Sequence, residues 1–277
     1  MTTLTLEVAG RRYRAEALSG IPIAIPLEFD GPQPSHFGAP PASSEAMKSG
    51  GFTGDTRRGG SCNARVLTLN PHCNGTHTEC VGHLTDEPVA IGALLREPLY
   101  LAALVTVDPV SGGGSAESAA HAFAPGDRVI TRVALAAALR DLETAGNQAL
   151  VVRTTPNGED KRTRRYEGES PAPFLTLEAA RYLVELGIEH LLVDLPSIDR
   201  AQDGGLLAAH RLFWGLPEGS RSAALAARPA ATITELVYVP DGVDDGLYLM
   251  SLQVPAFAGD AAPSRPLLYP ATLEADA

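Results

Sequence analysis

Alternating strand and helix patterns in the middle of the chain restrict its fold more than any other feature. Residues 99–107 form an apolar run with the length of a buried strand. Helical patterns follow over residues 133–143 and 176–186, and each leads to a glycine, Gly146 or Gly187, that suits a left-handed C-cap. Further strands are expected over residues 149–153, 190–194, 231–239 and 247–254. Because alternating strands and helices pack as layers, we expect an α/β domain with a mixed sheet.

The N-terminal part of the chain predicts different structure. Residues 2–15 alternate between apolar and polar side chains around an Ala-Gly turn, which is typical of an antiparallel β-hairpin. Residues 28–61 show almost no periodicity and are rich in Gly, Pro and Ser, which predicts a long loop. No linker interrupts residues 1–277, so we expect a single domain. The hairpin and the loop are then candidate lid or interface elements.

Composition excludes several classes of function. The 277 residues carry a net charge of −11, which argues against binding to nucleic acid or to an anionic membrane. The chain contains only three cysteines, too few for a disulfide framework. No apolar run has the length of a signal peptide's core at the N-terminus or of a membrane span elsewhere. We therefore expect a cytoplasmic protein that acts on a small molecule.

Residues 70–83 concentrate side chains that bind metals, and they hold three of the seven histidines of the chain. The candidates are His72, Cys73, His77, Glu79, Cys80 and His83. Thiolate, imidazole and carboxylate ligands together suit Zn²⁺, with Mn²⁺ less favoured by the sulfur. Three protein ligands around zinc leave a fourth position open for water, as in catalytic sites.

The spacing of these residues allows them to meet at one point. Cys73 and His77 are four residues apart, and Asn-Gly between them permits a tight turn. His77 and Glu79 are two apart and face the same side of an extended segment. His83 follows Gly82 and can fold back over the same centre.

This segment resembles the signature of the metal-dependent cyclase family, which includes bacterial kynurenine formamidase and isatin hydrolase. The signature reads His-x-Gly-Thr-His-x-Asp-x-Pro-x-His. Its core stands here as Gly75-Thr76-His77, and its last histidine is His83. The sequence departs from it with Cys73 for the first histidine, Glu79 for the aspartate and Val81 for the proline. Later segments resemble further motifs of the family in the same order: residues 194–199, Ala209-His210-Arg211 and residues 233–236.

The resemblance implies a swivelling β/α/β layered domain, with a mixed sheet and antiparallel terminal strands, that hydrolyses an amide or a cyclic amide. Metal-bound water would attack the carbonyl carbon, and His83 would move the proton. The implied ligands are Cys73, His77 and Glu79 for one ion, and Glu79, His210 and Glu235 for a second. His210 is therefore both a ligand and, with His83, a catalytic candidate. The family also implies one or two ions, an amide or lactam substrate, and a homodimer or homotetramer.

Two alternatives follow from the residues themselves. In another register, His72 would replace Cys73 as a ligand, although neighbouring side chains of an extended segment point to opposite sides. In the second alternative, the ligands close a four-coordinate zinc site without an open position. That site would be structural or redox-sensing, and it would use Cys73, His77, His83 and either Glu79 or Cys80.

Overall fold

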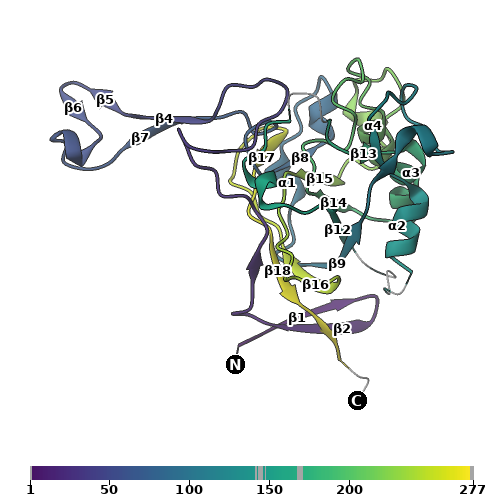
Figure 1. The fold of residues 1–277 in the computed structure, drawn as a ribbon. Coiled ribbons are helices and arrows are strands. Elements are labelled where there is room, and N and C mark those ends of the chain that lie inside the picture. Colours follow the sequence, from purple (N-terminus) through teal and green to yellow (C-terminus); the bar gives the residue numbers. More distant parts are fainter. Residues whose placement is uncertain (1, 141, 143–145, 147, 167–170, 275–277) are drawn as a thin grey trace.

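The central element of the fold is a nine-stranded mixed sheet. The structure is a computed structural model, which describes residues 2–140, 142, 146, 148–166 and 171–274 (Figure 1). Along the sheet the strands are β17 (Ala261–Pro263), β8 (His77–Cys80), β15 (Thr232–Glu235), β14 (His190–Val193), β12 (Ala149–Thr154), β9 (Tyr100–Val107), β16 (Gly246–Ser251), β18 (Leu267–Pro270) and β3 (Ile21–Pro22). The four strands β9, β12, β14 and β15 are parallel, and the outer strands pair antiparallel.

The parallel strands lie in the core of the molecule. Every residue of β12 and β14 is buried, as are all but one of the residues of β9. Parallel strands covered on both faces read as continuous apolar runs, and this is why residues 99–107 and 149–153 were recognisable in the sequence. The mixed α/β class predicted from the sequence is confirmed.

Helices α2 (Arg132–Ala138) and α3 (Leu177–Glu185) cover one face of this sheet (Figure 1). The Thr176 side chain caps α3 by accepting a hydrogen bond from the backbone N–H of Ala179. The helix expected over residues 133–143 ends at Ala138, and residues 141 and 143 of that range lie outside the described residues. The described residues also form two short helices, α1 (Ile91–Leu94) and α4 (Ala208–Trp214). A small sheet consists of β10 (Val110–Ser111), β11 (Arg128–Ile130) and β13 (Phe174–Leu175). None of the described helices is both long and apolar enough to span a bilayer.

The N-terminal hairpin is present as expected. Strands β1 (Thr3–Val8) and β2 (Arg11–Glu16) pair antiparallel, and β19 (Thr272–Leu273) adds to β2. The hairpin lies beside the central sheet, where Tyr13 of β2 packs in one cluster with Leu101 and Leu249.

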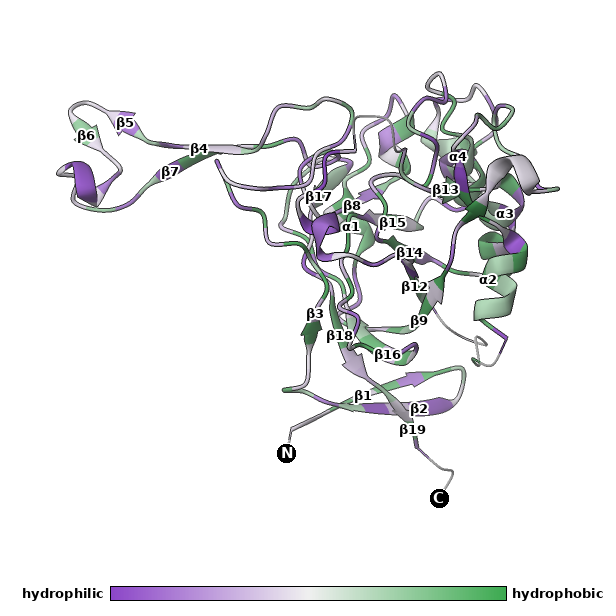
Figure 2. Cartoon of the chain, viewed as in Figure 1, coloured by the Kyte–Doolittle hydropathy of each residue, from purple (hydrophilic) through white to green (hydrophobic). Residues whose placement is uncertain are grey.

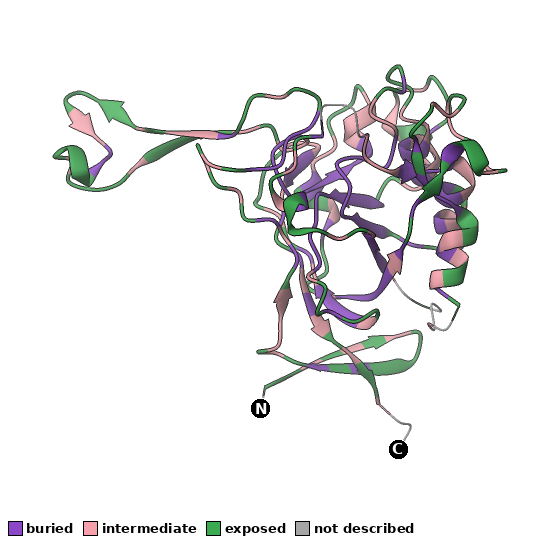
Figure 3. Ribbon diagram, viewed as in Figure 1, coloured by how far each residue is buried: buried purple, intermediate pink, exposed green. Residues whose placement is uncertain are grey.

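Residues 43–68 form a projecting β-arm, so residues 43–61 are not part of the irregular loop that we expected over residues 28–61 (Figure 1). Strands β4 (Ser43–Ala46) and β7 (Arg65–Thr68) pair antiparallel, and β5 (Lys48–Ser49) and β6 (Phe52–Thr53) form the tip. The arm points away from the body and is mostly exposed or half-buried (Figure 3). It shows no periodicity in sequence because neither face of its short ladder covers a core, and its hydropathy is mixed along its length (Figure 2).

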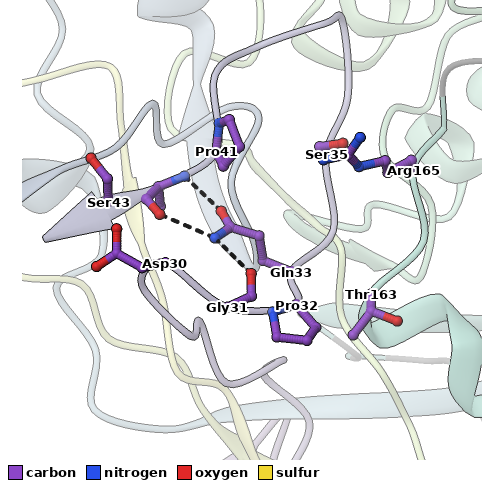
Figure 4. Close-up of a pocket in the computed structure, with 10 residues that line it drawn as sticks. Asp30, Gly31, Pro32, Gln33, Ser35, Pro41, Ser43, Thr163 and Arg165 are labelled. Carbon is purple, nitrogen blue, oxygen red and sulfur yellow. Dashed lines mark hydrogen bonds between the residues drawn. The ribbon is translucent and has the colours of Figure 1, made fainter.

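The buried side chain of Gln33 ties the base of the arm at Ala42 to the segment that precedes the arm. Its amide oxygen accepts a hydrogen bond from the Ala42 N–H at 2.6 Å, and its nitrogen donates to the Ala42 carbonyl at 3.1 Å (Figure 4). The same nitrogen lies 3.0 Å from the carbonyl of Glu28. A cavity of about 490 Å³ opens beside Gln33, between the arm and Thr163 and Arg165.

Candidate metal centre

The candidate centre begins at one pair of neighbouring strands. His77 and Glu79 lie two residues apart on β8, so their side chains share a face of the sheet. In the antiparallel register Glu235, the last residue of β15, lies opposite His77. Leu236 follows in a left-handed conformation with φ 54°, which ends the strand at this point. An imidazole and two carboxylates are thus held together in the buried part of the sheet.

One nitrogen of His77 lacks a partner. Nδ1 lies 3.1 Å from the carbonyl oxygen of Gly75, and because a carbonyl only accepts, Nδ1 carries the proton. The buried Nε2 has no hydrogen-bond partner among the described residues, and it lies 3.5 Å from a carboxylate oxygen of Glu235. A lone pair that faces a carboxylate in the protein interior is unfavourable unless a cation lies between them. This arrangement fits a bound metal ion.

His210 of α4 lies against the same two carboxylates. Its Nε2 is 2.9 Å from Oε1 of Glu79 and 3.6 Å from Oε1 of Glu235. Its Nδ1 is 2.7 Å from Oδ2 of Asp199, which also accepts the backbone N–H of His210 at 3.0 Å. Glu235 accepts a further bond from the Ile198 N–H at 2.9 Å. His210 and Glu235 are therefore each oriented by a further hydrogen-bond partner, as is usual for metal ligands.

The third part of the centre lies at its half-exposed edge. His72 Nδ1 is 2.8 Å from Oε2 of Glu79, and its Nε2 is 2.9 Å from Oδ2 of Asp260. The His83 ring stacks on His72 with ring centroids 4.2 Å apart. Its Nδ1 lies 3.6 Å from the same oxygen of Asp260, and its Nε2 lies 4.0 Å from Glu79.

The charges in this cluster shift the pKa values of its members. Burial raises the pKa of Glu79, but the cationic forms of His83 and His210 outweigh burial and hold it well below its usual range. Burial lowers the pKa of His210, whereas Glu79 and Asp199 together raise it well above its ordinary value. Burial likewise lowers the pKa of His72, yet its two carboxylate partners raise it to about 10. Without a metal the histidines supply positive charge to these carboxylates, and a bound cation can take over that role.

The ligand atoms of three sets lie within 4.8 Å of one another. The sets are His72, His77 and Glu79; Glu79, His210 and Glu235; and His72, His83 and Asp260. Glu79 belongs to the first two sets, so its carboxylate can bridge two ions. The structure thus brings together His77, Glu79, His210 and Glu235, with His83 beside them, as the sequence predicted.

Cys73 is placed differently from the expectation. It is buried and lines the same cavity, but within the described part of the chain it belongs to none of the three sets, where His72 stands instead. The backbone explains this exchange. The N–H groups of Cys73 and Asn74 both bond to the Asn70 carbonyl, at 3.1 and 3.0 Å, so residues 70–74 form a turn and not an extended segment. The choice of Cys73 came from its position in the signature. The alternation of side chains that argued against His72 applies to an extended segment and not to a turn.

The other cysteines lie apart from the candidate ligands. Cys80 is buried, its thiol donates to the Val89 carbonyl, and burial raises its pKa to about 12. Cys62 is exposed on the arm. A closed zinc site built on thiolates therefore lacks its sulfur ligands among the described residues.

A cavity of about 230 Å³ opens onto the centre. Side chains of His72, His83 and His210 are among those that line it. Phe37, Pro196 and Leu207 supply apolar walls, and the Phe37 ring is largely exposed at the mouth. The space admits a small molecule and suits one with an apolar portion.

Two features define the class of this protein. One is the layered α/β fold, and the other is the histidine-carboxylate cluster, which forms a candidate metal centre near one edge of the sheet. Residues 21–200 match the family described as "Putative cyclase". The chain belongs to this family, as the motif in residues 70–83 predicted.

Relatives in sequence and in structure agree with this assignment. The chain is 24% identical over 212 residues to a kynurenine formamidase of Bacillus mycoides, covering 76% of this chain and 82% of the relative. It is 27% identical over 214 residues to a kynurenine formamidase of Bacillus cereus, with the same coverage.

Two solved structures share the fold. One is a potential metal-dependent hydrolase with cyclase activity, with a TM-score of 0.60, 18% identity, and 90% of this chain and 96% of that chain covered. The other is an isatin hydrolase bound to the product analogue thioisatinate, with a TM-score of 0.56 and 16% identity over 91% and 92% of the chains.

Proposed function

We propose that this chain is a metal-dependent hydrolase that cleaves the C–N bond of a small amide or cyclic amide. The unpartnered, buried Nε2 of His77, which faces the Glu235 carboxylate, is the observation that carries the proposal. The relatives named as kynurenine formamidases and the isatin hydrolase of similar fold support an arylamine formamide or a lactam as the substrate class.

We assign the ligands by the two sets that share Glu79. His72, His77 and Glu79 would hold one ion, and Glu79, His210 and Glu235 a second. Imidazole and carboxylate donors suit both Zn²⁺ and Mn²⁺, and without a thiolate the preference for zinc is weaker than the sequence suggested. When bound, the metal supplies Lewis-acid chemistry, polarising the scissile carbonyl and making water more acidic.

The protein side chains position the substrate and move protons. His83 lines the cavity and is partly exposed, so its ring can take a proton from the attacking water and pass it to the leaving amine. Asp199 orients His210 through Nδ1 and fixes the start of α4. Phe37 and Leu207 lie where they can pack against the apolar part of a substrate and reduce its contact with water.

We further propose that the β-arm is an interface element of a homo-oligomer. Met47, Val66 and Leu67 are exposed on it by 41%, 53% and 52%. Met47 and Val66 share one face of the ladder and Leu67 lies on the other, so both faces expose apolar side chains that a second chain could cover.

The test is metal analysis followed by turnover. We expect protein purified without a metal-binding tag to contain one or two ions per chain, Zn²⁺ or Mn²⁺. We also expect it to hydrolyse N-formyl arylamines or isatin, with activity lost on chelation and restored by metal. Protein that takes up neither ion when supplied would refute the proposal. Metal-loaded protein that hydrolyses neither formamides nor lactams would overturn the substrate class.

A further inference from the structure

We propose that Asp260 is a positioning residue that orients both His72 and His83 through one carboxylate. The inference deepens the proposed function and depends on it. Asp260 lies outside the family-like motifs, since it is 177 positions beyond His83 in the sequence (260 − 83). Its carboxylate nevertheless lies 2.9 Å from Nε2 of His72 and 3.6 Å from Nδ1 of His83.

The contact of Asp260 with His72 determines which nitrogen of the His72 ring faces the other candidate ligands. An imidazole that binds a metal through one nitrogen carries its proton on the other. In the metal-free ring, Nε2 donates to Asp260 at 2.9 Å and Nδ1 donates to Glu79 at 2.8 Å. When a metal binds, Nδ1 is the nitrogen that gives up its proton, because Nε2 keeps its carboxylate acceptor. Without the carboxylate, the half-exposed His72 ring can rotate or protonate at the wrong nitrogen. Asp260 thus favours the one ring state in which His72 serves as a ligand.

The contact with His83 acts on the group that we assign to proton transfer. The His72 and His83 rings stack at 4.2 Å with an angle of 27° between their planes. Because the same Asp260 oxygen lies within reach of both rings, it also holds the pair in this stack. Asp260 is not among the residues that line the cavity, whereas both histidines are. It therefore acts through the histidines and not on the substrate.

The backbone of Asp260 is fixed well enough for this role. The Cys80 N–H donates to the Asp260 carbonyl at 3.0 Å, and the Ile91 N–H donates to the Gly259 carbonyl at 2.9 Å. The carboxylate thus starts from the first position before β17, directly beside β8. Gly82 permits this close approach, because a Cβ at that position would lie 3.0 Å from the Asp260 Cβ and 2.9 Å from the Val89 carbonyl.

The test compares Asp260→Ala and Asp260→Asn with Asp86→Asn, a matched change of an exposed aspartate that pairs only loosely with Arg221. Loss of an orienting carboxylate typically weakens metal binding about 10- to 100-fold. We expect a loss of this size for Asp260→Ala by titration of the metal-free protein, a smaller loss for Asp260→Asn, and none for Asp86→Asn. At saturating metal, we expect Asp260→Ala to lower kcat while KM changes little, because His83 no longer has a fixed orientation.

A spectroscopic readout separates positioning from general destabilisation. In ¹⁵N-histidine NMR spectra of zinc-loaded protein, we expect His72 to carry its proton on Nε2 in the wild type and to show mixed ring states in Asp260→Ala. Wild-type metal affinity, kcat and His72 signals in Asp260→Ala would overturn the inference. If the wild-type protein itself bound no metal, the proposed function would fail instead, and the two failures are therefore distinguishable.

Discussion

At the scale of single residues, we expect different roles for His72 and His83, the two histidines at the half-exposed edge of the centre. We expect His83→Ala to keep its metal and its thermal midpoint, because His83 is outside both sets that share Glu79. Removing a general acid-base typically costs about 10²- to 10⁴-fold in rate, and we expect kcat to fall within that range. The checks are metal content and steady-state kinetics on one preparation. A variant that loses its metal together with its activity would make His83 a ligand and not a proton carrier.

His72 and Cys73 can be distinguished by the same analysis. We expect His72→Ala to lower the bound metal strongly and Cys73→Ala to leave it near the wild-type level, since only His72 lies in a ligand set. The measurement is elemental analysis of each variant after dialysis against trace metal. The reverse result would restore the thiolate ligand that the signature position of Cys73 suggested.

Most of the centre was predictable from sequence, and the exceptions have physical reasons. His77, Glu79 and His83 are close in sequence, so their spacing reveals the site. His210 and Glu235 were identified through the family-like motifs. Asp260 and the exchange of Cys73 for His72 depend on a turn and on a strand pairing that local spacing does not encode.

At the scale of elements, β14 contains a titratable core residue that makes stability depend on pH. His190 is buried, its Nδ1 lies 2.9 Å from the Thr232 hydroxyl, and its ring packs on Tyr100. Burial lowers the pKa of His190 to about 4, from an ordinary value of 6.5. Between these values the unfolded chain binds the proton and the folded chain does not. Its contribution to stability is therefore present above pH 6.5 and is lost as the pH falls toward 4.

For β14 we predict that the wild type and His190→Asn differ in how their free energies of unfolding change with pH. At about 1.4 kcal/mol per pKa unit, protonation of His190 should lower the free energy of unfolding by about 3 kcal/mol by pH 4. We expect His190→Asn, which cannot titrate, to lose less stability than the wild type over this interval. The measurement is urea unfolding at several pH values, with the difference at pH 7 as the reference. Parallel curves would show that His190 titrates normally in the folded protein.

The elements differ in how well their sequences predicted them. Strands β9, β12 and β14 and helix α3 were predicted because burial on one or both faces imposes a pattern on the sequence. The arm was not, because its short strands pair with each other outside the core. Helix α4 was not anticipated either. Its seven residues are too few to show a helical period, and its start depends on the distant Asp199 carboxylate.

At the scale of the whole molecule, the arm gives a test of assembly. Met47, Val66 and Leu67 supply the exposed apolar surface of the arm, and the variant Met47→Ser, Val66→Thr, Leu67→Thr removes it while keeping the backbone pairing of β4 with β7. We expect the wild type to show a mass of two or four times the 29.0 kDa chain by light scattering. The triple variant should show a lower mass and an unchanged far-UV spectrum. A monomeric wild type would exclude the arm as an oligomer interface.

The order of strands in the central sheet has a consequence for the protein as it is being synthesised. Strand β9 pairs on one side with β12, but on the other with β16, whose residues 246–251 leave the ribosome much later. One edge of β9 therefore stays open until β16 has been synthesised, and it is a surface that chaperones can protect. The candidate centre lacks Glu235 and Asp260 over the same period. The set of Glu79, His210 and Glu235 is then completed only when β15 is in place, which would couple loading of the proposed second ion to completion of the sheet.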